Sequence, residues 1–322
     1  MAQPYAAIEP FSHGTLGVGD GNEIYWEMCG NRAGKTALVL HGGPGSGCSV
    51  WHRRLFDPAR YCIVLFDQRN CGRSLPHAGA PHIDLSTNTT HNLIADIETL
   101  RLHLGVQRWL LLGGSWGSAL ALAYAERFVH RVSEMVLFGI TTGRREEFDW
   151  LFREGLGRLF PTEWQRRRDA IPPGEQSGDI VETYSRLLHD SDAEVRASAA
   201  HAWCLWESAT PDWPPQPGLA PRFRDPRYAL AFARIVTHYV RHDAWLGDGA
   251  VMRDIDRLAT VPGVLINGRY DLQAPLATAW ELHQRWPGSE LVVIDDAGHS
   301  ASDARLTEAI VAATDRFAAA QR

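Results

Sequence analysis

One short stretch indicates the architecture of this chain: Leu110-Leu111-Leu112-Gly113-Gly114-Ser115-Trp116-Gly117-Ser118. It contains the pattern Gly-x-Ser-x-Gly between an apolar run and a small-residue, Ala/Leu-rich stretch at residues 119–125, which predicts a buried strand, a tight turn and a helix. Such a turn strains its middle residue, and glycine at Gly113 and Gly117 removes the Cβ atoms that would clash. We therefore expect the hydroxyl of Ser115 at the tip of the turn, where it can act as a nucleophile.

A second glycine-rich loop follows the apolar stretch Lys35–Leu40, which is a predicted strand, and has the sequence His41-Gly42-Gly43-Pro44-Gly45. Loops of this kind let backbone N–H groups face a ligand without obstruction by side chains. Acyl transfer at a serine needs two such donors for the oxyanion, one after the nucleophile and one from an early loop. The N–H groups of Gly43 and Trp116 are the candidates, with Gly42 as the alternative to Gly43.

Strands and helices alternate along much of the chain. Buried strands are predicted at 35–40, 61–66, 109–112, 135–138, 261–266 and 291–294, with an N-terminal hairpin at 13–28 and helices at 89–104, 280–286 and 303–319. This alternation is typical of a mostly parallel central sheet with helices on both faces.

The alternation stops at about Thr141. Residues 143–249 contain no strand-like run and are rich in Arg, Trp and Pro. Helices are predicted there at 144–155, 180–188, 193–208 and 228–239. We expect an α/β core domain formed by residues 1–142 and 250–322, and an inserted helical cap domain, residues 143–249, above the Ser115 turn.

Two further residues complete a catalytic set in the order nucleophile, acid, histidine. Asp271 and His299 each follow a predicted strand, and the carboxyl ends of parallel strands meet at one edge of a sheet. Imidazole can take the serine proton near neutral pH, and a carboxylate on its other nitrogen fixes the tautomer and stabilises the imidazolium. Asp295 and Asp296 are alternative acids, but their closeness to His299 in sequence is more typical of loop residues.

Composition restricts the partners. The chain has 322 residues and a formal net charge of -6, which argues against nucleic acid or an anionic membrane as the main partner. No stretch approaches about 18 consecutive apolar residues, and the first residues lack the pattern of a secretory signal. The 5 cysteines include no Cys-x-x-Cys pair, so we expect free thiols in a reducing cytoplasm.

No metal or cofactor is expected. The sequence contains neither His-Glu-x-x-His nor paired Cys-x-x-Cys, and the glycine-rich loop lacks the Gly-x-x-x-x-Gly-Lys pattern that binds nucleotide phosphates. The oligomeric state is left open. Asp67, Arg69 and Arg73 are expected to brace a loop beneath the site, and Cys71 is expected close enough for thiol reagents to inhibit by steric blockage.

Several motifs together resemble the proline iminopeptidases, or prolyl aminopeptidases, of the α/β-hydrolase fold. They are His41-Gly42-Gly43-Pro44-Gly45, Asp67-Gln68-Arg69-Asn70-Cys71-Gly72-Arg73-Ser74, Gly113-Gly114-Ser115-Trp116-Gly117-Ser118, Gly268-Arg269-Tyr270-Asp271 and Ala297-Gly298-His299. The resemblance runs the whole length of the chain. It implies a serine exopeptidase that releases N-terminal proline from small peptides or aminoacyl compounds, with no metal or cofactor.

The resemblance also implies roles for residues of the cap. Trp203-Cys204-Leu205-Trp206-Glu207 is similar to the family segment whose glutamate binds the substrate's free α-amino group, as a buried ammonium needs a charged partner. By its residue type alone, Glu207 reads as a solvated charge on a helix. At three further substrate-binding positions the chain departs from the family pattern, with Val236 in place of a second glutamate, Phe152 in place of tyrosine and Thr141 in place of phenylalanine.

These departures keep a second function open, an esterase or amidase acting on a different small molecule without a free amine. A third possibility is a non-enzymatic binding protein on the same scaffold, which the intact set of Ser115, Asp271 and His299 disfavours.

Overall fold

The computed structural model describes residues 3–176, 178–212, 214–215 and 217–319. Its centre is an 8-stranded sheet in the order β1-β2-β4-β3-β5-β6-β7-β8. The antiparallel pairs are β1 with β2 and β2 with β4, and the strands from β4 across to β8 run parallel. The strands are β1 (Pro10–Gly17), β2 (Glu23–Gly30), β3 (Lys35–Leu40), β4 (Tyr61–Phe66), β5 (Trp109–Gly114), β6 (Val132–Phe138), β7 (Gly263–Gly268) and β8 (Ser289–Ile294).

Helices cover both faces of this sheet, as the alternation of strands and helices predicts. Successive residues of a strand point to opposite faces, and in β3 the side chain of Leu38 packs in one hydrophobic cluster while that of Val39 packs in the other. The first cluster takes in α2 (Thr90–His103), α3 (Trp116–Arg127), α10 (Ala250–Asp254) and α11 (Leu276–Arg285), and the second takes in α12 (Ala304–Ala319). The short α1 (Val50–Arg53) lies beside β4.

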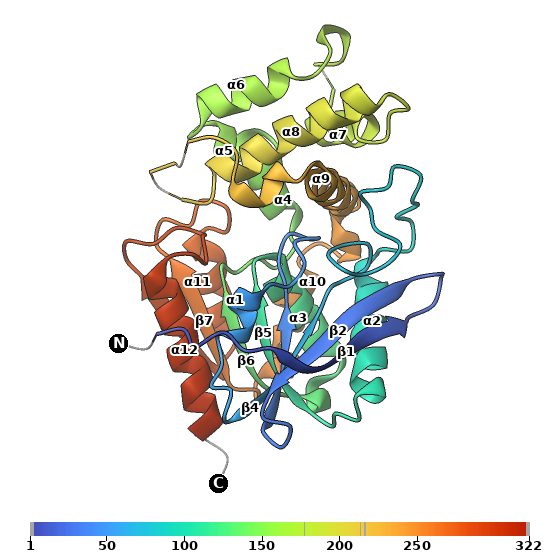
Figure 1. Ribbon diagram of the computed structural model, residues 1–322. Helices are drawn as coiled ribbons and strands as arrows, with labels where there is room; N and C mark the ends of the chain where they lie inside the picture. The colour runs from blue at the N-terminus through green and yellow to red at the C-terminus, as the bar shows by residue number, and fades with distance from the viewer. Residues whose placement is uncertain (1–2, 177, 213, 216, 320–322) are drawn as a thin grey trace.

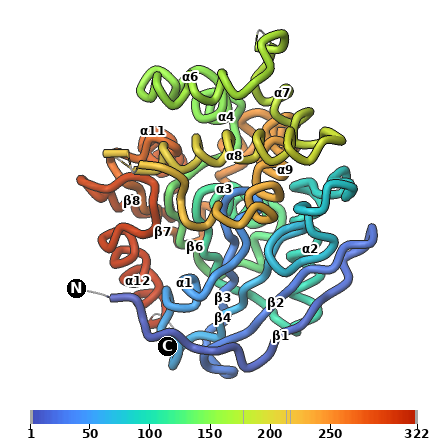
Figure 2. The backbone as a smooth tube through the Cα atoms, turned by 45° about the horizontal axis from the view of Figure 1, so that its top comes forward, coloured from blue at the N-terminus to red at the C-terminus, as the bar shows by residue number. Residues whose placement is uncertain are grey.

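The chain between β6 and β7 forms helices in its described part, and Figures 1 and 2 show most of them as a separate layer across one end of the sheet. These helices are α4 (Arg145–Phe152), α5 (Glu154–Gly157), α6 (Pro161–Asp169), α7 (Ile180–Leu187), α8 (Ala193–Ala209) and α9 (Pro226–Arg241). The sequence did not predict α6, because it is polar and Arg-rich and has no apolar stripe.

Side-chain caps explain where the long helices of this layer begin. The carboxylates of Asp179, Asp192 and Asp225 accept hydrogen bonds from the first backbone N–H groups of α7, α8 and α9. Among the described residues, no helix is long and apolar enough to cross a membrane.

Candidate active site

Ser115 sits in a strained turn between β5 and α3. Its backbone has φ 54° and ψ -128°, a conformation that costs a non-glycine residue about 1–3 kcal/mol. The turn is tight at both flanking glycines: a Cβ at Gly113 would lie 2.3 Å from the carbonyl oxygen of Gly117, and a Cβ at Gly117 would lie 2.0 Å from that of Leu40. The glycines of the pattern are therefore required by close backbone packing, as the sequence predicts.

His299 and Asp271 form a hydrogen-bonded pair, with 2.8 Å between His299 Nδ1 and Asp271 Oδ2. The other carboxylate oxygen of Asp271 accepts the N–H of Ala274 at 2.7 Å, which fixes its orientation. Burial lowers the pKa of His299, but the charge and hydrogen bond of Asp271 outweigh burial, so that the pKa is raised above its ordinary value. The ring can therefore accept and hold a proton on its other nitrogen.

The rival acids lie elsewhere. The side chains of Asp295 and Asp296 are 72% and 81% exposed, and they form ion pairs with Arg269 and Arg305. Of the three candidate acids, Asp271 is the one that the structure brings to His299.

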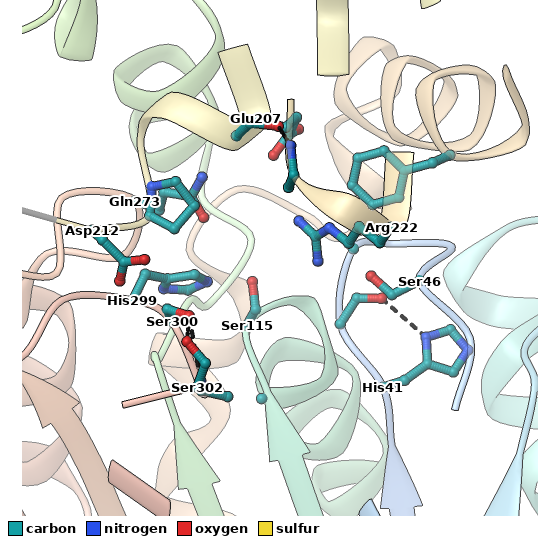
Figure 3. Close-up of a pocket in the computed structure, with 18 of the residues that line it drawn as sticks. His41, Ser46, Ser115, Glu207, Asp212, Arg222, Gln273, His299, Ser300 and Ser302 are labelled. Carbon is teal, nitrogen blue, oxygen red and sulfur yellow. Dashed lines mark hydrogen bonds between the residues drawn. The ribbon is translucent and has the colours of Figure 1, made fainter. Parts of the chain in front are cut away.

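Ser115 and His299 line the same cavity, and Figure 3 shows both side chains pointing into it from neighbouring loops. The hydrogen bonds of the described residues include none between these two side chains; catalytic contacts of this kind often tighten only when substrate binds. Gly139, directly after β6, leaves room for the His299 ring beside it, since a Cβ there would lie 2.9 Å from Cε1 of His299. Sequence reasoning did not identify Gly139.

The two candidate oxyanion donors lie beside Ser115. Gly43 and Trp116 border a small cavity together with Ser115, and among the described residues neither backbone N–H donates to a protein acceptor. Gly42 also lies close, because a Cβ on it would be 3.2 Å from the Cβ of Ser115. A carbonyl oxygen attacked by Ser115 would thus find uncommitted donors beside it.

Gln68 joins the two loops that carry these donors, and sequence reasoning missed it. Its backbone N–H donates to His41 Nε2 at 3.0 Å and its side chain donates to the His41 carbonyl at 2.9 Å. Its own amide oxygen accepts the indole N–H of Trp116 at 3.1 Å. Burial lowers the pKa of His41, so its ring stays neutral and accepts this bond. The available signal was the position of Gln68, which directly follows Asp67, the first residue after the predicted strand 61–66.

Asp67 braces the neighbouring loop, as the sequence predicts. Its carboxylate accepts the N–H of Cys48 at 2.7 Å and that of Arg73 at 2.8 Å, and also pairs with the Arg73 guanidinium. Cys71 lies close to the site, with 3.5 Å between its Sγ and Nε2 of His41, and inhibition by thiol reagents stays a prediction. That thiol is 1% exposed, does not line either cavity at Ser115, and has a pKa raised well above its ordinary value by burial. A buried, protonated thiol is a poor target for thiol reagents.

Above Ser115 lies a cavity of about 680 Å³ between the sheet and the helical layer. Glu207, near the end of α8, reaches into it, although it is only 6% exposed. Its Oε1 has no hydrogen-bond partner among the described residues. Burial raises the pKa of Glu207, while the positive charges of Arg222 and Arg167 lower it. A buried carboxylate oxygen without a donor is suited to a charged donor on a ligand.

A smaller cavity of about 50 Å³ also adjoins Ser115, and it shares Phe152 and His299 with the large one. Thr141 and Phe152 line it, and the hydroxyl of Thr141 donates to Glu147 at 2.6 Å. Phe152 stacks on Trp203 with ring centroids 5.5 Å apart. Val236 differs from these residues: it is fully buried in the hydrophobic core and lines neither cavity, although Phe232, one turn earlier on the same face of α9, lines the large one.

The structure adds two charged residues that the sequence did not single out. Asp212 and Arg222 line the large cavity, and Figure 3 shows both directed toward its centre. They lie in the Pro-rich segment between α8 and α9, where no periodic pattern marks a functional position. Among the described residues, no group of His, Cys, Asp and Glu side chains is arranged to hold a metal ion.

Comparison with known proteins identifies the family. The alpha/beta hydrolase fold family matches residues 36–305. A protein of Streptomyces coelicolor named "Probable proline iminopeptidase" is 50% identical over 318 residues, which cover 98% of this chain and 97% of that protein. The proline iminopeptidase of Xylella fastidiosa strain Temecula1 is 46% identical over 98% of this chain and 100% of its own length. That of Arabidopsis thaliana is 41% identical over 98% of this chain and 82% of its own length.

The chain belongs to the proline iminopeptidase family. More distant solved structures share its fold. The bromoperoxidase from Bacillus anthracis is 18% identical with a TM-score of 0.66 and covers 95% of this chain and 99% of its own. VinJ is 20% identical with a TM-score of 0.62, and the match covers 96% of this chain and 99% of VinJ. The resemblance predicted from the motifs is thus confirmed for the family and for the α/β-hydrolase fold.

Proposed function

We propose that this chain is a serine aminopeptidase that releases N-terminal proline, or another small residue, from short peptides and aminoacyl amides. The observation that carries the proposal is the single cavity bordered by Ser115, His299 and the buried carboxylate of Glu207. Relatives similar over nearly the whole chain bear the name proline iminopeptidase, which supports the same activity here. No metal or cofactor is needed for this chemistry.

In the proposed reaction, Ser115 Oγ attacks the scissile carbonyl while His299 takes its proton, and Asp271 stabilises the resulting imidazolium. The negative charge that develops on the carbonyl oxygen is held by the N–H groups of Gly43 and Trp116. The C–N bond then breaks, the leaving amine takes the proton from His299, and an acyl-enzyme remains. Water that loses a proton to His299 attacks the ester carbonyl. The C–O bond to Ser115 then breaks, His299 returns the proton to Ser115 Oγ, and the free amino acid is released.

Recognition of the substrate is proposed to divide between the two cavities. The substrate's α-ammonium would meet the unpartnered oxygen of Glu207, and its small side chain would enter the cavity lined by Thr141 and Phe152. Val236 contributes no carboxylate, so the ammonium would be held by one carboxylate. Residues 143–249 would act as a cap domain that closes this site, over a core of residues 1–142 and 250–322.

Substrate profiling tests the proposal. We expect turnover of prolyl and alanyl nitroanilides and none of N-acetylprolyl nitroanilide, because acetylation removes the charge that Glu207 would recognise. Turnover of neutral esters with no activity on any aminoacyl amide would instead favour the esterase alternative. Failure of a fluorophosphonate probe to label Ser115 would favour a non-enzymatic binding protein.

A cytoplasmic location is proposed on the basis of the free thiols of Cys29, Cys48, Cys62, Cys71 and Cys204.

A further inference from the structure

Arg222 is a cation that the proposed reaction does not use. It lies in a short 3-10 helix, Pro221–Arg224, between α8 and α9, and it lines the large cavity. In Figure 3 its guanidinium extends from the cap into the space above Ser115. The main charges acting on the pKa of both Glu207 and His299 include that of Arg222, so its charge reaches the reacting centre.

The donors of Arg222 are uncommitted. Among the described residues it forms no ion pair and donates no hydrogen bond. Its guanidinium lies 4.5 Å from the ring centroid of Phe223 and 5.6 Å from that of Phe232. Aromatic rings hold a guanidinium in place through its face and leave its N–H edge free. That edge is suited to bidentate binding of a carboxylate.

The location of this donor edge relates it to one part of the substrate. Glu207, which borders the large cavity, supplies a negative charge for the amino end, and the adjoining small cavity, proposed for the side chain of the N-terminal residue, does not include Arg222. The leaving group is then the part of the substrate that remains for the rest of the large cavity, which Arg222 borders. Arg224 also borders this cavity, but it is not among the main charges that act on Glu207 and His299.

We propose that Arg222 forms a subsite for a carboxylate on the leaving-group side of the substrate, so that the enzyme prefers short peptides with an anionic residue after the scissile bond. This inference rests on the proposed aminopeptidase activity. The carboxylate has two sources, the free C-terminus of a dipeptide or the side chain of an acidic residue. The alternative role of Arg222 is to act as a counter-ion for Glu207. Loss of Arg222 would then reduce the turnover of anionic and neutral substrates equally.

Matched substrates distinguish these roles. Pro-Ala and its amide Pro-Ala-NH2 differ only at the C-terminal carboxylate, and Pro-Glu-NH2 and Pro-Gln-NH2 differ only at the side chain. We expect the wild-type enzyme to prefer the anionic member of at least one pair. In Arg222→Met that preference should fall about 10- to 100-fold through a higher KM, as expected for loss of a charge-assisted hydrogen bond. The neutral substrates should change little.

The control is Arg166→Met, which removes an exposed arginine of the cap that lines neither cavity and should leave both preferences intact. Equal loss on anionic and neutral substrates in Arg222→Met would assign Arg222 to Glu207 and overturn the proposal. Unchanged kinetics on every substrate would also overturn it.

Calorimetric binding to Ser115→Ala separates this proposal from the proposed function. Tighter binding of Pro-Ala than of Pro-Ala-NH2, or of Pro-Glu-NH2 than of Pro-Gln-NH2, that disappears when Arg222→Met is added would support the subsite even if the wild-type enzyme hydrolysed no peptide. Equal binding within both pairs would refute the subsite even in an active aminopeptidase.

Discussion

Ser115 combines backbone strain with an uncommitted hydroxyl, and both follow from its place between β5 and α3. Replacing its hydroxyl with hydrogen leaves the turn and the surrounding glycines unchanged. We therefore expect Ser115→Ala to remain folded while kcat on prolyl nitroanilide falls at least about 1,000-fold, the effect of removing one member of a catalytic triad. Unfolding curves would establish the fold, and a variant with nearly full kcat would refute the assignment of the nucleophile.

Glu207 offers a second test at the scale of one residue, because its charge acts on a substrate ammonium and on His299. Glu207→Gln should lower kcat/KM for prolyl nitroanilide about 10- to 100-fold, since a charge-assisted bond to the substrate is lost. Glu182→Gln is the matched control, as Glu182 is an exposed glutamate of the cap that lines neither cavity.

The pH profile of the same variant checks the coupling to His299. His299 must be neutral to take the serine proton, so activity falls as pH drops through its pKa. The negative charge of Glu207 raises that pKa. In Glu207→Gln the acid limb of kcat/KM, measured on any neutral ester that the enzyme hydrolyses, should therefore move to lower pH. An acid limb that stays in place or moves to higher pH would contradict this coupling.

At the scale of elements, the sequence predicts best where one local pattern determines the structure. β3 and β4 begin and end at the predicted residues, because the run Ala37–Leu40 in β3 and the whole of β4 are apolar and buried on both faces. The structure of the turn after β5 is also determined locally, since its glycines are required by close backbone contacts within the motif and with β3. α6 was missed because it has no apolar stripe, and its contacts with the other helices of this layer depend on side chains such as Arg167, whose guanidinium lies over aromatic rings.

Gly117 allows a test of that local packing. Alanine at this helical position would gain about 1 kcal/mol of helix propensity over glycine. However, its Cβ would lie 2.0 Å from the carbonyl oxygen of Leu40, and no side-chain rotation relieves a clash with backbone. The clash should dominate, so that Gly117→Ala lowers the free energy of unfolding by at least about 2 kcal/mol.

The matched control is Gly174→Ala, where a Cβ would meet nothing within 4 Å. Denaturant unfolding of both variants measures the difference. Equal stability of Gly117→Ala and the wild type would mean that β3 and α3 can separate at no cost, contrary to the close packing described here.

At the scale of the whole molecule, sequence patterns lose their predictive value where the helical layer between β6 and β7 meets the rest of the structure. The order of Ser115, Asp271 and His299 along the chain was sufficient to predict their meeting, because parallel strands end at one edge. The outcome for Val236 was not predictable in the same way. Which residues of α9 reach the cavity depends on how that helix packs against α7, α8 and the core: Phe232 lines the cavity, whereas Val236, one turn later on the same face, is buried and does not line it. The position of Arg222 was not predictable either, because it depends on the fold of a Pro-rich connection whose sequence has no periodicity.

Arg234 of α9 holds this arrangement together. It is almost fully buried, and its guanidinium donates to the carbonyl oxygens of Ala78, Ala80 and Ile83 in a loop of the core. Burial lowers its pKa to about 10, but it remains charged at neutral pH. Arg234→Met would leave one buried and two partly buried carbonyl groups without their donor, at a cost of about 1–3 kcal/mol for a buried unsatisfied group. We expect a loss of at least about 3 kcal/mol in the free energy of unfolding, together with faster proteolysis between the cap and the core.

Arg241→Met is the control on the same helix, because Arg241 forms an ion pair with Glu182 at the surface. Exposed pairs of this kind contribute about 0.2–1 kcal/mol. Both variants remove one positive charge from α9 and replace a long side chain with methionine, so a difference between them reports on the contacts that Arg234 makes with the core loop and with His189. If both variants lost the same small amount of stability, α9 would not be anchored to the core through Arg234, and the position of the cap over Ser115 would have to depend on other contacts.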